Sequence, residues 1–271
     1  MKYILLIFFF VLMISATSFS QTNSGVITYT ITARYKKVDQ YKLYFKNSSS
    51  ILIANRGIKK SVIKIYDEKL KLDTFSVSDK EFEEALYAHK LITTYYIDEE
   101  GDVIYKNFET NSLIIRDVNE RKPILIEEPQ MPFQNWTLID SSKKIGKFNC
   151  QKAKTVFRGR VYEAWYTLEI PVSNGPWKLH GLPGLILESN TTDKFFICTF
   201  VSIEIPLKDK TIINPPVTGH KTGMLNYQKQ IEKDLDEKVR ISNANQQSRG
   251  TNVTVSRKTS PYQELNYDDL K

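Results

Sequence analysis

The chain has 271 residues, of which 41% are hydrophobic and 25% charged, a composition ordinary for a globular protein of one large or two small domains. Its formal net charge of +7 is spread along the sequence, with pairs such as Lys36 and Lys37 or Lys143 and Lys144. A nucleic-acid-binding protein would cluster these charges on one face among aromatic residues, so the charge pattern argues against a nucleic-acid partner.

The first residues have the pattern of a secretory signal. Lys2 gives a positive start, residues 3–14 form an apolar core, and residues 18–20 (SFS) form a small-x-small cleavage site. We expect residues 1–20 to be removed, with a mature start near Gln21 and a periplasmic or secreted location; an uncleaved anchor is the alternative. No later stretch approaches the about 18 apolar residues of a membrane span, so none is expected in the mature chain.

The N-terminal half predicts short strands joined by turns, because apolar and polar residues alternate between loops rich in Asn, Asp, Ser and Gly. Residues 59–78 are polar and ambiguous. The expected strands are residues 24–35, 41–46, 50–54, 93–97, 103–108, 112–117 and 123–127.

The C-terminal half continues this pattern and ends in a helix over residues 225–239, where a helical apolar stripe runs among charged residues. We expect a single domain over residues 21–240 and a polar, partly disordered tail over residues 241–271. The layout indicates a mainly-β fold, an antiparallel open half-barrel or barrel-like sheet with a C-terminal helix; a closed barrel or sandwich is the alternative. The further expected strands are residues 136–140, 148–157, 160–170 and 195–205.

Residues 174–188 (NGPWKLHGLPGLILE) form the stretch around which the chain is organised. Alternation predicts a strand with Trp177 and Leu179 on one face and Lys178 and a solvent-facing His180 on the other. A type II turn would follow, with φ > 0 at Gly184, leading into a doubly buried apolar strand.

This stretch resembles a known family. Gly181, Leu182, Pro183, Gly184, Leu185 and Ile186 spell the signature of the GLPGLI family of secreted proteins, best known from the Bacteroidetes. The resemblance extends upstream to Trp136, and departs from the family pattern at Leu168 and Trp177. The family has no established activity, so the resemblance implies export and membership, not a function.

Two cysteines, Cys150 and Cys198, each lie inside an expected strand. A disulfide is permitted in an oxidising compartment and would enclose the signature, but bridging requires Cα atoms within about 7 Å. Two separate buried thiols are the alternative.

Four aromatic residues near the signature are candidates for ligand or partner binding: Trp165, Tyr166, Trp177 and His180. Core packing is the simpler explanation for the larger rings, and a ligand or partner groove is the alternative. The three histidines have no metal-ligand spacing, and no catalytic or phosphate-binding motif occurs, so we expect no metal, cofactor or catalytic residue.

We therefore expect a non-enzymatic binding or accessory protein of the cell envelope, whose concave β face holds an apolar ligand or a segment of an envelope protein. A carboxylate-dependent hydrolase is one alternative and would require Glu169, Glu188 and His180 to converge. A structural protein that pairs through an edge strand is the other.

Overall fold

The computed structural model describes residues 24–33, 39–46, 48–54, 58–67, 70–75, 91–119, 122–208 and 212–248. The expected signal peptide, His89 and the last part of the tail lie outside these ranges.

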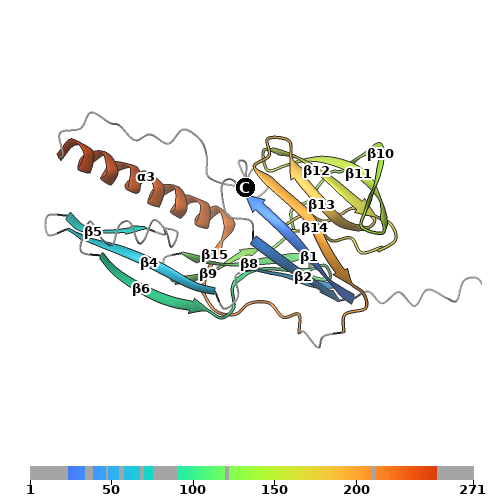
Figure 1. Cartoon of the computed structure of the whole chain (residues 1–271), viewed down its shortest axis with the longest axis horizontal. Coiled ribbons are helices and arrows are strands. Elements are labelled where there is room, and N and C mark those ends of the chain that lie inside the picture. The colour runs from blue at the N-terminus through green and yellow to red at the C-terminus, as the bar shows by residue number, and fades with distance from the viewer. Residues whose placement is uncertain are drawn as a thin grey trace, which may run out of the picture.

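Twelve of the 15 described strands form one open sheet (Figure 1), in the order β10-β11-β12-β13-β14-β1-β2-β3-β7-β8-β9-β15. The expected mainly-β, open architecture with a C-terminal helix is confirmed, since the sheet does not close into a barrel. Its strands are β1 (Ser24–Ala33), β2 (Asp39–Lys46), β3 (Ser49–Ala54), β7 (Asp102–Asn107), β8 (Ser112–Asn119), β9 (Lys122–Glu128), β10 (Thr137–Ile145), β11 (Phe148–Phe157), β12 (Arg160–Thr167), β13 (Leu185–Thr191), β14 (Phe196–Glu204) and β15 (His220–Gly223).

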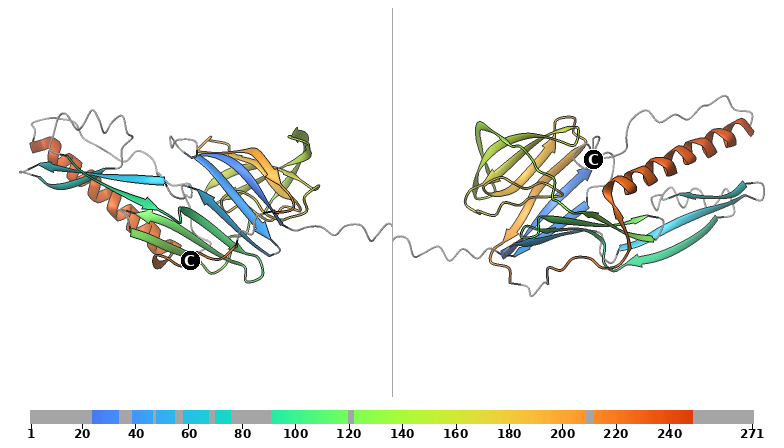
Figure 2. Two further views of the ribbon diagram at one scale, coloured as in Figure 1. Left: turned by 60° about the horizontal axis from the view of Figure 1, so that its bottom comes forward. Right: turned by 180° about the vertical axis from the view of Figure 1, so that it is seen from behind.

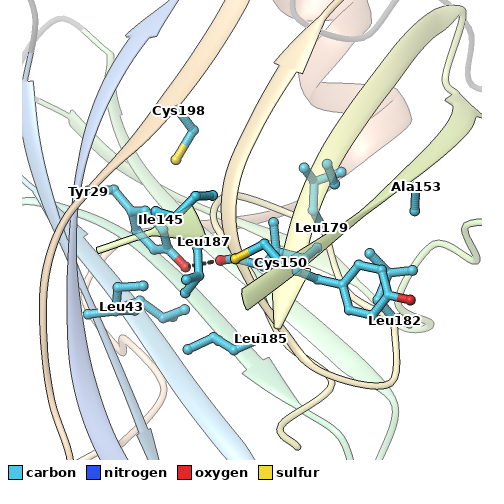
Figure 3. Packing of buried hydrophobic residues seen from close by; sticks show 14 of the residues in the cluster. Tyr29, Leu43, Ile145, Cys150, Ala153, Leu179, Leu182, Leu185, Leu187 and Cys198 are labelled. Atoms are coloured by element: carbon cyan, nitrogen blue, oxygen red, sulfur yellow. Dashed lines mark hydrogen bonds between the residues drawn. The ribbon is translucent and has the colours of Figure 1, made fainter. Parts of the chain in front are cut away.

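Two antiparallel meanders, β10-β11-β12-β13-β14 and β1-β2-β3-β7-β8-β9, meet where β1 pairs with β14, and β15 pairs in parallel with β9. Strands β13 and β14 pair at only two positions, so the sheet opens beside β13. The Tyr29 hydroxyl of β1 donates a 2.5 Å hydrogen bond to the Ile186 carbonyl of β13 (Figure 3). The Tyr29 side chain thus joins β1 to β13 at a point where no backbone pairing between strands does so.

A smaller sheet has the order β5-β4-β6, with β4 (Ile58–Asp67), β5 (Leu70–Phe75) and β6 (Leu91–Asp98). Its strands β4 and β5 occupy most of residues 59–78, for which the residue pattern predicts no definite secondary structure. Both views of Figure 2 place this sheet and helix α3 (Met224–Ser248) at one end of the molecule and β10–β14 at the other.

Helix α3 begins at Met224 and continues past the expected end at Val239 to Ser248. Its first turns are anchored on the large sheet, because buried Met224 packs against Ile126 of β9. The Tyr227 hydroxyl also donates to Asp117 Oδ2 of β8 at 2.7 Å.

The main hydrophobic core collects residues from both meanders, including Tyr29, Leu43, Tyr162 and Phe196. The expected burial of the strand after the signature is confirmed, since Leu185, Ile186 and Leu187 of β13 are fully buried. Burying a side chain of this size contributes about 1.5–3 kcal/mol relative to leaving it exposed.

The signature itself does not form the expected strand and turn. Residues 168–184, here called the signature loop, connect β12 to β13 and contain only an isolated bridge between Asn174 and His180. The left-handed residues are Trp177 (φ 52°) and Gly181 (φ 91°), and Gly184 is not among them. The prediction for Gly184 was wrong because the chain turns earlier, and the absent side chain serves a close backbone contact instead.

Candidate functional site

The signature loop lies between the two meanders of the curled sheet. Leu179 and Leu182 join the same core cluster as Tyr29 and Leu43 (Figure 3). Contacts from the loop to β7 and β9 cross to strands far from β12 in the sheet order. β7 and β9 can reach the loop only because the sheet curls around it.

Lys106 of β7 makes the first of these contacts. Its Nζ donates to Asn174 Oδ1 at 3.0 Å, to the Gly175 carbonyl at 2.8 Å and to the Leu179 carbonyl at 3.0 Å. The side chain is 1% exposed, and burial lowers the pKa of Lys106 to about 7. One ammonium group therefore ties β7 to both ends of the loop segment 174–179.

Glu128 at the end of β9 makes the second contact. It accepts hydrogen bonds from Lys178 of the loop and from the two terminal guanidinium nitrogens of Arg158, at 3.2 and 2.6 Å. Burial alone would raise the pKa of Glu128, but the two cations outweigh it, so the pKa lies below its usual value. The expectation that Lys178 shares a solvent-facing surface with His180 was wrong, because Lys178 is 2% exposed.

His180 is held by the segment before β10. Its backbone N–H donates to Gln134 Oε1 at 2.9 Å, and its carbonyl accepts from Trp136 Nε1 at 2.7 Å. Ring atom Nε2 lies 3.1 Å from the Pro132 carbonyl, and the ring meets Phe108 edge-on. Burial, with a smaller effect of the Lys106 charge, lowers the pKa of His180 to about 4. The imidazole is thus a half-buried neutral group, not the solvent-facing one expected.

The other three aromatic candidates do not form a common surface with His180. Trp177 is half-buried against the core and stacks on Tyr162, with ring centroids 5.8 Å apart. Tyr166 is 1% exposed, and its hydroxyl donates to Gln151 Oε1 at 2.8 Å. Trp165 points to the opposite face of β12, where Lys143 Nζ lies 4.6 Å from its ring centroid.

The three groups required by a hydrolase also have separate partners. Glu169 accepts from the backbone N–H of Asn149 at 2.7 Å, and Glu188 pairs with Lys143 at 2.5 Å. His180 contacts neither carboxylate, since its ring faces Pro132 and Phe108. The structure therefore assembles no acid-base site from these residues.

Cys150 and Cys198 are both buried and both free thiols. They lie on β11 and β14, which β12 and β13 separate in the sheet order. Burial raises the pKa of Cys150 to about 11 and that of Cys198 well above its usual value. Both thiols are therefore protonated and inert at neutral pH.

A small pocket opens where the signature loop begins. The Phe108 N–H donates to the Ser48 carbonyl at 2.7 Å, which holds the β2–β3 turn beside the β7–β8 turn. The pocket has a volume of about 230 Å³ and is mainly apolar. Its lining residues are Phe45, Ser49, Phe108, Pro171, Val172, Ser173 and Asn174.

Asn174 is one of the polar residues in the lining of this pocket, and its side chain links the loop to β7. Its Oδ1 accepts from Lys106 Nζ at 3.0 Å and from the Gly175 N–H at 2.8 Å. Two donors on one atom identify it as the amide oxygen, so the other atom is the amide nitrogen. That Nδ2 is buried and has no hydrogen-bond partner in the described part of the chain.

The sequence did not reveal this pocket. Asn174 opens the organising stretch and Phe108 ends an expected strand, but neither alone marks a site. Their proximity follows from the curl of the sheet, for which local residue patterns carry no signal. The run Asn174, Gly175 and Pro176 was the available hint, since an unusual loop inside a β protein often has a function.

The sequence model of a family described as "Protein of unknown function (Porph_ging)" matches residues 156–188. No curated protein is significantly similar to the chain. Two solved structures of PNGF-II, in space groups C2 and P21, superpose with TM-scores of 0.48 and 0.47 at 17% and 16% identity. They cover 78% of this chain and 33% of theirs, so the chain spans about a third of their length.

The family match falls on the end of β11, on β12, on the whole signature loop and on the first residues of β13. It therefore includes Asn174 and Lys178 but not Lys106 or Glu128, the residues that hold the loop from the other meander.

Within the described ranges, no group of three or more His, Cys, Asp or Glu residues is arranged to hold a metal ion. The described helix is too polar to cross a bilayer.

Proposed function

We propose that the chain is an exported, non-enzymatic binding or accessory protein of the cell envelope and a member of the GLPGLI family. Its binding site is the pocket at the start of the signature loop. The single observation that carries this proposal is a mainly apolar pocket whose lining also includes the polar residues Ser49, Ser173 and Asn174. Sites for small ligands typically combine an apolar lining with a few polar groups that fix orientation.

This site replaces the broad concave face expected from the sequence. The signature loop and the core side chains fill the inside of the curl, and Tyr166 and Trp177 are part of that filling. Phe45 and Phe108 offer the apolar surface that those two residues were expected to supply.

The alternative role of an edge strand has weaker support. β10 forms one edge of the large sheet, but a register shift interrupts its pairing between Ile139 and Ser142. Lys143 and Lys144 follow on the same strand. Bulges and lysines discourage further strands from pairing with an edge.

The binding role is tested by filling the pocket. In NMR titrations with small apolar fragments, we expect the backbone amides of Ser173 and Gly175 to shift in the wild-type protein. The variant Val172→Trp should lose these shifts, because its larger side chain occupies much of the pocket volume. Val217→Trp is the control, because Val217 is 83% exposed and does not line the pocket. If no fragment perturbs these amides in the wild-type protein, the pocket is not a binding site.

A further inference from the structure

We propose that Asn174 is the site of a spontaneous self-modification, in which its side-chain amide loses ammonia and becomes the carboxylate of an aspartate. The backbone nitrogen of Gly175 is the nucleophile, and Lys106 assists the reaction and pairs with the product. The inference goes beyond the proposed binding role and does not depend on it. It follows from two unfavourable features of the buried amide and from the groups that surround its carbonyl oxygen.

The first unfavourable feature is a buried cation without a counter-ion. Lys106 is 1% exposed, and its Nζ donates only to uncharged oxygens, those of the Asn174 side chain and of the Gly175 and Leu179 carbonyls. Burial lowers the pKa of Lys106 to about 7, and no carboxylate in the described ranges opposes this shift. A carboxylate in direct contact would stabilise the ammonium form.

The second unfavourable feature is a buried donor without an acceptor. Asn174 is 1% exposed, and its Nδ2 has no hydrogen-bond partner in the part of the chain that the structure describes. A polar group that is buried and left unpaired destabilises the fold. Replacing Nδ2 by a carboxylate oxygen removes this donor and gives Lys106 its counter-ion. One change of atom therefore relieves both features.

The residue that follows Asn174 supplies the nucleophile. Asn174 and Gly175 form the only Asn-Gly pair in the sequence, and glycine has no side chain to hinder its backbone nitrogen. This nitrogen lies 2.8 Å from Asn174 Oδ1, so it is close to the Cγ atom that it attacks. Lys106 Nζ donates to the same Oδ1 at 3.0 Å. A donor placed there stabilises the negative charge that develops on Oδ1 during the attack.

The reaction has two balanced steps and changes no oxidation state. Hydroxide removes the Gly175 N–H proton, the nitrogen forms a bond to Asn174 Cγ, and the Cγ–Nδ2 bond breaks, with Nδ2 taking a proton from water and leaving as ammonia. Water from the pocket that Asn174 helps to line then adds to Cγ of the cyclic imide. The bond between Cγ and the Gly175 nitrogen breaks, and that nitrogen regains a proton.

Lys106 also determines the product of the second step. Attack of water at Cγ gives aspartate, whereas attack at the backbone carbonyl of residue 174 gives isoaspartate. Because Lys106 stabilises charge on Oδ1 and not on the backbone oxygen, the attack at Cγ is favoured. The folded chain should therefore form aspartate alone.

The test follows residue 174 by peptide mapping with mass spectrometry in the mature chain at neutral pH, both folded and unfolded in guanidinium chloride. We expect conversion to be at least tenfold faster in the folded chain and to give aspartate without isoaspartate. A rate no faster than that of the unfolded chain would overturn the proposal, because the fold would then protect the amide. A cross-link between Lys106 and Asn174 would overturn the assignment of Gly175 as the nucleophile.

Lys106→Met tests the assisting cation, since methionine keeps an unbranched apolar chain but has no charge and no donor. We expect conversion to slow at least tenfold and isoaspartate to appear. Lys144→Met removes the same charge at an exposed position on β10 and should react like the wild type. Wild-type rate and product in Lys106→Met would overturn the role of Lys106. The comparison of folded with unfolded wild type decides the proposal even if this variant does not fold.

Asn174→Asp is the proposed product and can be made directly. We expect it to melt at a higher temperature than unconverted wild type at neutral pH, because its carboxylate pairs with Lys106. Asn226→Asp makes the same charge change at an exposed position on α3 and should leave the melting temperature unchanged. A lower melting temperature for Asn174→Asp would overturn the proposed ion pair.

Discussion

Gly184 is required by a close approach of two backbone segments. A Cβ built on it would lie 2.0 Å from the Thr167 carbonyl oxygen, which the end of β12 holds in place. Gly181 is required for its left-handed conformation, and a Cβ there would meet Trp136 at an ordinary 3.7 Å. The two glycines of the signature therefore have different physical roles.

This difference predicts an order of stability between two variants. Gly184→Ala should cost about 3 kcal/mol or more, because backbone atoms must move to relieve the overlap. Gly181→Ala should cost about 1–2 kcal/mol, the penalty of a left-handed residue with a Cβ. Thermal unfolding measures both. A larger loss for Gly181→Ala would contradict the close contact at Gly184.

At the scale of elements, the signature loop is coupled to the segment before β10 through a neutral histidine. The pKa of His180 is about 4 in the folded chain and 6.5 ordinarily. Between these values the unfolded chain binds a proton that the folded chain does not, so stability falls as the pH decreases from 6.5 to 4. Below pH 4 both states are protonated and the loss is complete, at roughly 3 kcal/mol.

We predict that His180→Gln removes this part of the pH dependence, since glutamine does not titrate and can still donate to the Pro132 carbonyl. Urea unfolding at pH 6.5 and pH 4.5 compares the two proteins. Protonation of Glu128 destabilises the wild type and the variant alike, so the difference between their pH slopes isolates the histidine. Identical slopes would show that the imidazole is not buried in the neutral form.

The elements that the sequence predicted well are those whose residues alternate. The strand over residues 24–35 and the helix near residue 225 were recognisable because one face of each is apolar. Trp177 to His180 also alternate, yet they form a loop, because Lys106, Glu128 and Gln134 satisfy the polar groups that a strand ladder would satisfy. Those partners lie 44–73 residues away in the sequence, which no local pattern can show.

At the scale of the whole molecule, a curled open sheet is held in shape by a loop from its own chain. β1 joins β14 edge to edge, while Lys106 and Glu128 hold the signature loop across the interior. The pocket depends on this arrangement, because its lining comes from β2, β3, the turn that follows β7 and the loop. The signature, which the sequence predicts to be a turn between strands, is therefore part of a loop that fills the interior of the curled sheet.

Native-state hydrogen exchange tests this central claim most directly. The amides of Leu179, Leu185 and Ile186 donate to the carbonyls of Pro176, Ile170 and Asn174 within the signature loop region. If the loop is an integral part of the core, these amides exchange only through global unfolding, with the same free energy and denaturant dependence as amides of β1. Exchange of the three amides by a lower-energy local opening, while β1 stays protected, would contradict the claim.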